Sequence, residues 1–220
     1  MIRRLPFTII FSLAAFSAFG FEWTAWDLDV GVTWQFNGEI GTAADRKQPS
    51  KIMFNPGASA LADFDGEDGG WFFRPGGWFS WNIEDLQEGV ARPCDEAEAD
   101  HMKVLGLMGD AHFGYAFDAG KAVIGVQGGP SFYFRFPLWT AESGTATPGD
   151  FWKAYYAGAE FLHLGIASWA AFRISESMDA TVGLKLYQPL STIWTEAPLF
   201  HGFQVSLTGS LRFRLDGRKE

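Results

Sequence analysis

The sequence predicts an all-β protein, an eight-stranded antiparallel up-and-down transmembrane β-barrel. Apolar and polar side chains alternate with a period of two along most of the 220-residue chain, and the side chains of a β-strand point alternately to its two faces. The connections between these segments are alternately long and short, and aromatic residues gather at the segment ends. Together these three observations favour a membrane barrel over a soluble sheet.

The alternation is clearest in residues 203–215, where odd positions are apolar or Gly and even positions are polar. In the second expected strand the alternation is interrupted at Pro56. Because proline cannot donate to a ladder, a bulge or an early strand start is expected there. The parity also changes near Phe161, which predicts a β-bulge. The expected strands are residues 26–37, 52–64, 71–83, 101–117, 122–136, 154–174, 180–190 and 203–215.

Connection lengths support closure into a barrel. Bacterial outer-membrane barrels have short turns on the periplasmic side and long loops outside. Here every odd-numbered connection is long and every even-numbered one is short, whereas a soluble sandwich has no reason to segregate them. The expected long loops are residues 38–50, 84–100, 137–152 and 191–200, and the short turns are 65–70, 118–121 and 175–179.

Aromatic residues make up 17% of the chain, with 22 Phe and 10 Trp. They end the fourth strand at residues 113–117 and the fifth at residues 132–136, while the middles of these strands hold Leu, Ile and Val. Such girdles around an aliphatic belt are expected at two membrane–water interfaces. The alternative, an aromatic-rich soluble core, gives no reason for rings to gather at strand ends.

The first twenty residues predict a signal peptide. Arg3 and Arg4 form a basic start, an apolar run follows, and Ala18 and Gly20 are small residues at the positions that a signal peptidase reads. The alternative is an uncleaved anchor, but the run is shorter than the roughly 20 residues of a spanning helix. The expected organisation is a signal peptide at 1–20, the barrel at 21–215 and a polar tail at 216–220.

Charge and cysteine content narrow the possible partners. The chain has 17 basic and 26 acidic residues, a net charge of −9. Loss of residues 1–20 removes two arginines, so the mature chain would carry −11. Because nucleic-acid binding needs a basic face, no nucleic-acid partner is expected. Cys94 is the single cysteine, so no internal disulfide stabilises the chain.

On strand pattern and loop alternation, residues 21–215 resemble the small eight-stranded outer-membrane barrels of the OmpX, OmpA-barrel and OmpW types. The resemblance implies the outer membrane of a double-membraned bacterium, with membrane lipid and the barrel-assembly machinery as partners. One departure is the carboxy-terminal end, where these barrels finish on an aromatic residue. Here residues 216–220 follow Leu215, and Phe213 is the internal equivalent.

Eight strands leave a lumen that side chains fill, so an open porin is not expected. In a closed barrel the first strand neighbours the last, which brings Asp27 and Asp29 to the depth of Arg212 and Arg214. Charges in a low-dielectric wall are costly unless they are paired, so ion pairs are predicted across this seam. The same network is expected to include Asp110, Arg74, Arg173 and Lys185.

No enzyme, cofactor or metal site is predicted. Hydrolysis by a triad requires a nucleophile, a His and an orienting group. His112 shares a strand face with Asp110, but no Ser or Cys is placed in the sequence as its nucleophile.

Two classes of function stay open. The barrel is either a narrow passive path for small apolar compounds or a purely structural barrel. A lateral opening near Phe161 or Pro130 would serve the first role, because each position disturbs the ladder. The alternative is a surface-exposed interaction protein or adhesin, acting on an extracellular partner through its long loops, mainly residues 84–100 and 137–152.

Overall fold

The computed structural model describes residues 22–36, 51–64, 69–87, 90–93, 101–140, 146–195 and 199–215. The predicted signal peptide at 1–20, the polar tail, most of the 65–70 turn and Cys94 lie outside these residues. The strands are β1 (Glu22–Phe36), β2 (Lys51–Asp63), β3 (Gly70–Gln87), β4 (Val90–Pro93), β5 (His101–Asp118), β6 (Val123–Thr140), β7 (Leu162–Ser175), β8 (Met178–Pro189) and β9 (Phe203–Arg214).

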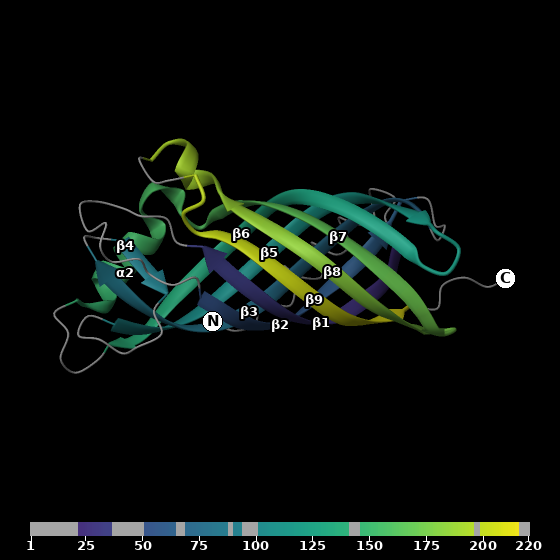
Figure 1. Cartoon of the computed structure of the whole chain (residues 1–220), viewed down its shortest axis with the longest axis horizontal. Coiled ribbons are helices and arrows are strands. Elements are labelled where there is room, and N and C mark those ends of the chain that lie inside the picture. Colours follow the sequence, from purple (N-terminus) through teal and green to yellow (C-terminus); the bar gives the residue numbers. More distant parts are fainter. Residues whose placement is uncertain are drawn as a thin grey trace, which may run out of the picture.

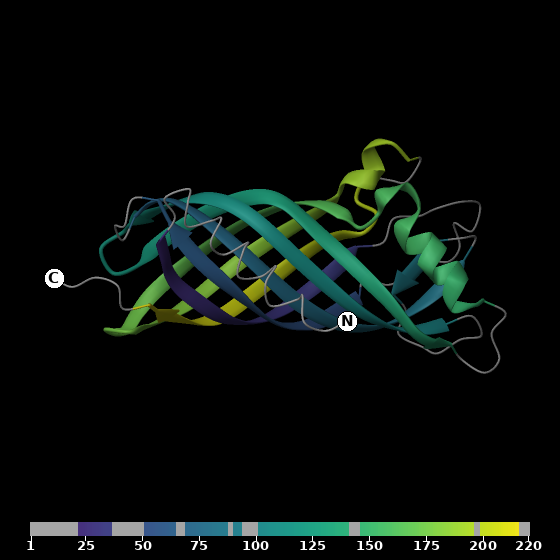
Figure 2. The ribbon, with the colours of Figure 1, turned by 180° about the vertical axis from the view of Figure 1, so that it is seen from behind.

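Eight of these strands close into one antiparallel barrel (Figures 1 and 2). The hydrogen-bonded order is β2-β1-β9-β8-β7-β6-β5-β3, and a β2–β3 pairing closes the ring. The first and last strands are neighbours, with Asp27 opposite Arg212. The predicted closed eight-stranded antiparallel barrel is therefore confirmed, and β4 is an extra strand that pairs only with β3.

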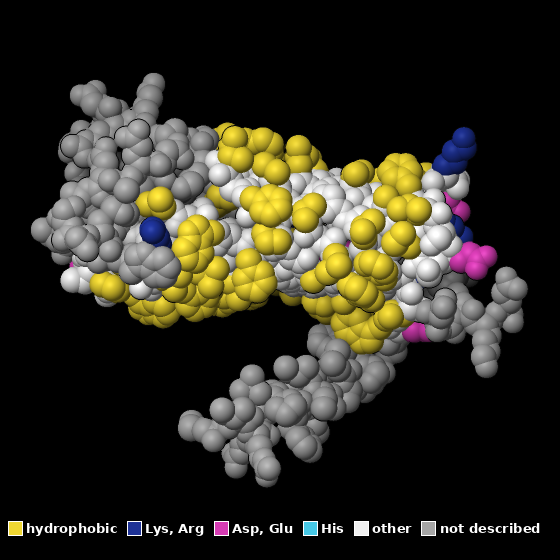
Figure 3. Space-filling view, turned by 90° about the horizontal axis from the view of Figure 1, so that it is seen from below, with side chains coloured by type: hydrophobic (Ala, Val, Ile, Leu, Met, Phe, Trp, Pro, Cys, Tyr) yellow, Lys and Arg dark blue, Asp and Glu magenta, His cyan; other side chains and the backbone are white. Residues whose placement is uncertain are grey.

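The barrel wall is apolar outside and polar inside. On β1, Leu28 is 50% exposed and Val30 is 52% exposed, whereas the alternating Asp27 and Asp29 are 0% and 3% exposed. Apolar side chains cover much of the outer wall, while acidic and basic side chains show at the barrel ends (Figure 3). A soluble domain buries its apolar residues, so this inverted arrangement excludes the soluble-core alternative for the described strands.

Residues 84–87 and 90–93 are strands, although the acidity of residues 84–100 suggested a loop. Strand β3 continues to Gln87 and turns back through β4, with Glu84 opposite Pro93. Strand β5 extends equally far, because Glu84 also faces Met102. Since a strand continues as long as both edges find partners, pairing here outweighs the local charge.

Residues 154–161 correct the sixth expected strand. The chain forms the α-helix α2 (Pro148–Tyr156) and a 3₁₀ turn, η1 (Ala157–Ala159), before β7 begins at Leu162. The parity change near Phe161 is thus a helix-to-strand transition and no bulge. Thr147 and Asp150 form a capping box with Pro at the helix start, which is a sequence signal for a helix. None of the described helices has the length and apolar character needed to cross a membrane.

Helix α2 packs on the part of the sheet that rises above the other strands. Phe151, Ala154 and Tyr155 form a small core with Met102, Val104 and Ala91 of β5 and β4. Because Met102 and Val104 continue the lumen-facing parity of β5, this cap covers the outer mouth of the barrel (Figure 2).

Two seams, here meaning places where adjacent strands stop pairing, divide the wall of the barrel toward the end with the long connections. The β6–β7 ladder ends at Phe132 opposite Leu162, although β6 runs on to Thr140. The β2–β3 ladder begins at Gly57 opposite Trp78, although β2 starts at Lys51. Beyond these points, Tyr133 N still donates to Phe161 O, and side chains such as Asn55 and Tyr156 bridge the gaps between strands.

Proline explains part of this pattern. The β1–β2 register passes through Pro56 without a shift, so the bulge expected there is wrong. Pro56 instead marks the point beyond which β2 leaves β3, consistent with its missing N–H. The β5–β6 ladder likewise skips Pro130 and Gly129 and resumes in the same register.

Candidate functional site: the polar lumen and its cap

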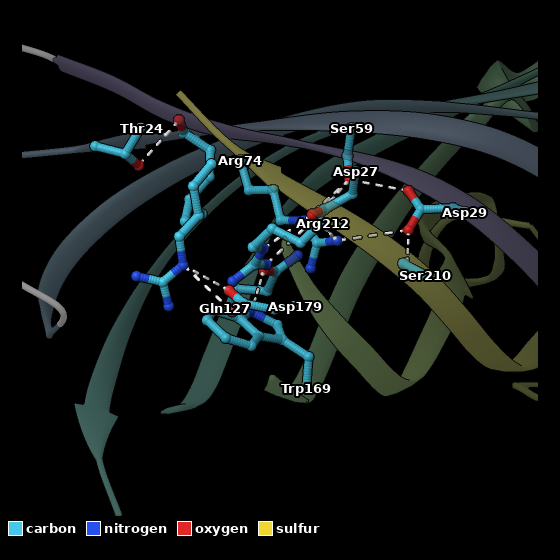
Figure 4. Close-up of polar contacts among 12 residues, drawn as sticks. Thr24, Asp27, Asp29, Ser59, Arg74, Gln127, Trp169, Asp179, Ser210 and Arg212 are labelled. Atoms are coloured by element: carbon cyan, nitrogen blue, oxygen red, sulfur yellow. Dashed lines mark hydrogen bonds and ion pairs between the residues drawn. The ribbon is translucent and has the colours of Figure 1, made fainter. Parts of the chain in front are cut away.

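Asp27 is the centre of a buried ion-pair cluster near the short turns (Figure 4). Arg212 donates from Nε to Oδ1 at 2.8 Å and from Nη2 to Oδ2 at 3.2 Å. Arg74 donates from Nη2 to Oδ2 at 2.5 Å. The Asp27 side chain has no exposed surface. The structure therefore brings the predicted Asp27–Arg212 pair together across the closing seam and adds a second guanidinium to it.

Asp29 and Arg214 do not meet. In the β1–β9 register Asp29 faces Ser210, while Arg214 lies four residues away beside Ala25. Asp29 accepts a short hydrogen bond from Ser210 and lies 3.6 Å from Arg74 Nη2. Because the strands are antiparallel, the register that sets Asp27 opposite Arg212 sets Asp29 opposite Ser210 and leaves Arg214 opposite Ala25.

Arg214 instead binds Asp179 on β8, with Nε 3.0 Å from Oδ2. Asp179 was expected to lie in the turn and was not predicted as a lumen residue. Its side chain is 1% exposed, and it has the same parity as Thr181 and Lys185. That parity is the sequence signal that could have found it.

An aromatic and amide layer lies beside the Asp27 cluster. The Arg212 guanidinium lies 4.3 Å from the ring centroid of Trp169, within cation–π distance. Trp169 donates from Nε1 to Gln127 Oε1 at 3.2 Å. A Cβ on Gly125 would lie 2.2 Å from the Trp169 ring, so the ring occupies space that only Gly leaves free.

The middle of the lumen is organised around Asp110. Tyr187 donates its hydroxyl to Asp110 Oδ2 at 2.9 Å, and Lys185 Nζ lies 3.7 Å from the same oxygen. Lys185 Nζ also lies 3.1 Å from the ring centroid of Trp78. The buried ammonium thus has a carboxylate and an aromatic face as its neighbours, which offset its desolvation.

A small cavity of about 20 Å³ adjoins Lys185. Lys185 Nζ, Asn55 Oδ1 and Trp78 Nε1 line it and have no hydrogen-bond partner among the described residues. A polar space of this size accommodates about one water molecule. It is too small to be a solute path.

His112 corrects one expectation about catalysis. Ser131 lies on the neighbouring strand, with its Oγ 3.0 Å from His112 Nε2, so a hydroxyl does face the imidazole. The sequence separation of nineteen residues hid this contact. Gln127 Nε2 lies 3.0 Å from His112 Nδ1.

The hydrogen bonds of this group do not suit nucleophilic catalysis. Trp169 occupies Gln127 Oε1, so Gln127 donates its N–H to His112 Nδ1. The imidazole proton then lies on Nε2 and points toward Ser131, whereas a general base must accept the proton of the Ser hydroxyl. His112 and Ser131 are both 0% exposed, so the group serves as lumen packing.

Arg135 organises the outer end of the lumen. Its guanidinium lies 3.5 Å from Glu84 Oε2 and 3.3 Å from Glu160 Oε2, and 4.2 Å from the Tyr155 ring centroid. Burial raises the pKa of Tyr155. Burial also raises the pKa of Glu160, with Arg135 acting in the opposite direction. Sequence reasoning missed this cluster because two of its members belong to the unexpected helical segment.

The eight predicted lumen residues therefore differ in burial: six are buried and two are not. Arg173 is exposed at the short-turn end, just before the β7–β8 register shift, and lies outside the buried lumen. Arg214 is partly buried. The buried members are Asp27, Asp29, Arg74, Asp110, Lys185 and Arg212.

Comparison with known proteins bears on the fold. Neisserial surface protein A is similar over 89% of this chain and 99% of its own, with a TM-score of 0.51 and 11% identity. The two share a fold. Ail, the attachment invasion locus protein of Yersinia pestis, covers 88% of this chain and all of its own at a TM-score of 0.43 and 10% identity. The sequence matches no protein-family model and no curated protein.

The architectural resemblance to small eight-stranded barrels is thus confirmed at the level of the fold. The closed ring of strands in this chain agrees with it independently of the comparison.

Proposed function

We propose that this protein is a non-enzymatic, structural β-barrel of the outer membrane of a double-membraned bacterium, with a lumen that does not conduct. The observation that carries the proposal is the inverted wall, apolar outside and filled inside by ion pairs such as Asp27–Arg212. Apolar surface of this extent is stable only against lipid or detergent. Closure removes the free strand edges that lipid could not satisfy.

Outward-facing rings support the membrane location. Trp26 stacks on Phe213 at 4.4 Å near the short turns, and Phe36 lies 6.0 Å from Phe203 at the other end of the same strand pair. Between them lie Leu, Val and Gly, and Trp34 adjoins the Phe36–Phe203 pair. Two ring levels around an aliphatic belt match the two interfaces of a bilayer.

The proposed partners follow from this location. Membrane lipid covers the wall, and the barrel-assembly machinery inserts the chain, with Phe213 near the end of β9 as the closing aromatic residue. An extracellular partner would meet the cap formed by α2 and the tips of β3, β4, β5 and β6. No cofactor or nucleic acid takes part.

Two measurements test the proposal. In outer-membrane fractions we expect an electrophoretic band that shifts on boiling, because folded barrels resist detergent until heated. In planar bilayers we expect no stable conductance, with a porin as the positive control. A soluble protein without a heat shift would contradict the location, and steady conductance would contradict the filled lumen.

The two seams favour a second candidate, a narrow path for small apolar compounds that leaves through the wall. The β6–β7 ladder ends at Phe132, and one further backbone hydrogen bond runs from Tyr133 N to Phe161 O at 2.7 Å. The Tyr156 hydroxyl accepts from Arg135 N at 3.2 Å and donates to Arg135 O at 3.0 Å. Faster uptake of an apolar dye by vesicles carrying Tyr156→Phe than by vesicles carrying the unsubstituted protein would favour this candidate.

A further inference from the structure

The loop between β8 and β9 displays large apolar side chains at the outer end of the barrel. Ile193, Trp194, Leu199 and Phe200 are 70%, 53%, 60% and 62% exposed. None of the four carries a formal charge, and they lie within eight positions of one another. Such a concentration of exposed apolar residues marks a contact surface.

In the described parts of the loop, residues 190–195 and 199–202, hydrogen bonds hold the backbone, so these side chains are displayed in a defined arrangement. Trp194 donates from Nε1 to Gly158 O at 2.7 Å, which ties the loop to η1. Thr195 Oγ1 donates to Ser191 O at 2.9 Å, and Gln188 Nε2 donates to Leu199 O at 2.6 Å. The exposure therefore belongs to the folded loop.

A row of rings continues this surface on the neighbouring side. Trp152 of α2, which is 47% exposed, lies 4.7 Å from Tyr156 and 6.2 Å from Phe136 of β6. Tyr156 in turn lies 6.0 Å from Phe161. The Trp194–Gly158 hydrogen bond joins this row to the β8–β9 loop. We call Trp152, Ile193, Trp194, Leu199 and Phe200 the apolar collar.

The collar is continuous with the outer wall of the barrel. Phe200 lies 5.8 Å from Phe203, which lies 6.0 Å from Phe36, and Phe36 points outward at the end of β1. The η2 segment (Leu190–Ile193) at the start of the loop stands out from the side of the wall and does not cross the mouth (Figures 1 and 2).

We propose that the apolar collar rests in the lipid surface of the outer leaflet and anchors the cap there. This inference rests on the proposed membrane location. Irregular backbone is not tolerated in the hydrocarbon core, whereas Trp and other aromatic side chains are favoured at the interface. The collar therefore sits at headgroup level, directly above the belt that Phe36 and Phe203 end.

Labelling at single cysteines tests the depth of the collar. In a Cys94→Ser background of the mature chain, Phe200→Cys, Val30→Cys and Ala119→Cys are each labelled with the fluorophore NBD. Val30 points outward in mid-wall, and Ala119 lies in an exposed turn. The barrels are refolded into vesicles of phosphatidylethanolamine and phosphatidylglycerol, with shallow or deep nitroxide lipids as quenchers. Leu199→Cys is a second collar position.

The label at Val30 should lie deepest in the bilayer, the label at Phe200 at an intermediate depth, and the label at Ala119 in water. The Phe200 label should emit at shorter wavelength than the Ala119 label, and shallow nitroxides should quench it at least twofold more than deep ones. If the Val30 label is in lipid but both collar labels are quenched only by iodide, the collar inference is overturned and the membrane barrel stands.

Two further outcomes would overturn the inference. If the labels at Val30 and Phe200 both report water, the membrane location itself fails. If the Phe200 blue shift disappears on dilution of protein in lipid, a second copy of the chain covers the collar instead of lipid.

Discussion

Replacement of Asp27 by Asn tests whether the ion-pair cluster holds the barrel closed. The change keeps the size of the side chain and removes one charge from a site with no exposed surface. Arg74 and Arg212 then keep two nearby carboxylates, Asp29 at 3.6 Å from Arg74 and Asp179 opposite Arg212 in the β8–β9 register. Loss of one partner from a buried pair costs about 3–5 kcal/mol, and we expect a loss of that size in the free energy of unfolding.

Urea titration of the barrel refolded in lipid vesicles measures this loss. With a slope of about 2 kcal/mol per molar urea, the midpoint should fall by about 2 M. Glu176→Gln removes the same charge from an exposed turn and should change stability by less than about 0.5 kcal/mol.

A double variant separates the pair from its surroundings. Asp27→Asn combined with Arg212→Gln should cost less than the sum of the two single changes, because the second change removes a cation that the first left unpaired. If Asp27→Asn is no more destabilising than Glu176→Gln, the reasoning about the closing seam is wrong.

Three further predictions follow from packing and hydrogen bonding. Gly165→Ala should destabilise the barrel by about 1–3 kcal/mol, because its Cβ would lie 2.3 Å from a buried imidazole; Gly209→Ala, with open space around it, should be nearly neutral in the same urea titration. Tyr156→Phe removes the hydroxyl that accepts from Arg135 N and should therefore speed exchange of this β6 amide. Tyr115→Phe, on the outer wall, should not, and equal exchange rates in the two variants would contradict the Tyr156–Arg135 contact. Hydrogen bonds from the backbone and hydroxyl of the N-cap residue lower the pKa of Asp150, so its support of α2 is present above the usual carboxyl pKa and is lost as pH falls through the lowered value; amide shifts of α2 should titrate there, and Asp150→Asn should abolish that titration.

Strand parity explains why so much of the fold could be predicted. A period of two fixes which side chains share a face, so the alternation in residues 203–215 already separated wall from lumen. Long and short connections added the direction of each strand. The expectation that Asp27 and Asp29 lie near Arg212 and Arg214 needed only the further assumption that the first and last strands meet.

Register was the first quantity that the sequence left open. A shift of two residues keeps every side chain on its face and still changes its opposite partner. In the closed ring, Asp29 pairs with Ser210, and Arg214 pairs with Asp179. The contact of His112 with Ser131 likewise depends on how β5 and β6 are aligned.

The helical cap was not predicted for a different reason. The capping box at Thr147 and Asp150 was present in the sequence, and so was the spacing of Phe151, Ala154 and Tyr155 on one helix face. Strand alternation on both sides obscured these signals. Whether such a short helix is stable depends on what it packs against, here the rising tips of β4 and β5.

The sequence by itself determined an all-β chain whose eight alternating strands form a barrel, because periodicity, composition and connection length are local properties. Only the tertiary structure decided which charges meet, how the upper wall divides at Phe132 and Gly57, and where α2 lies. These features depend on distances between residues far apart in the chain, and closure of the ring sets those distances.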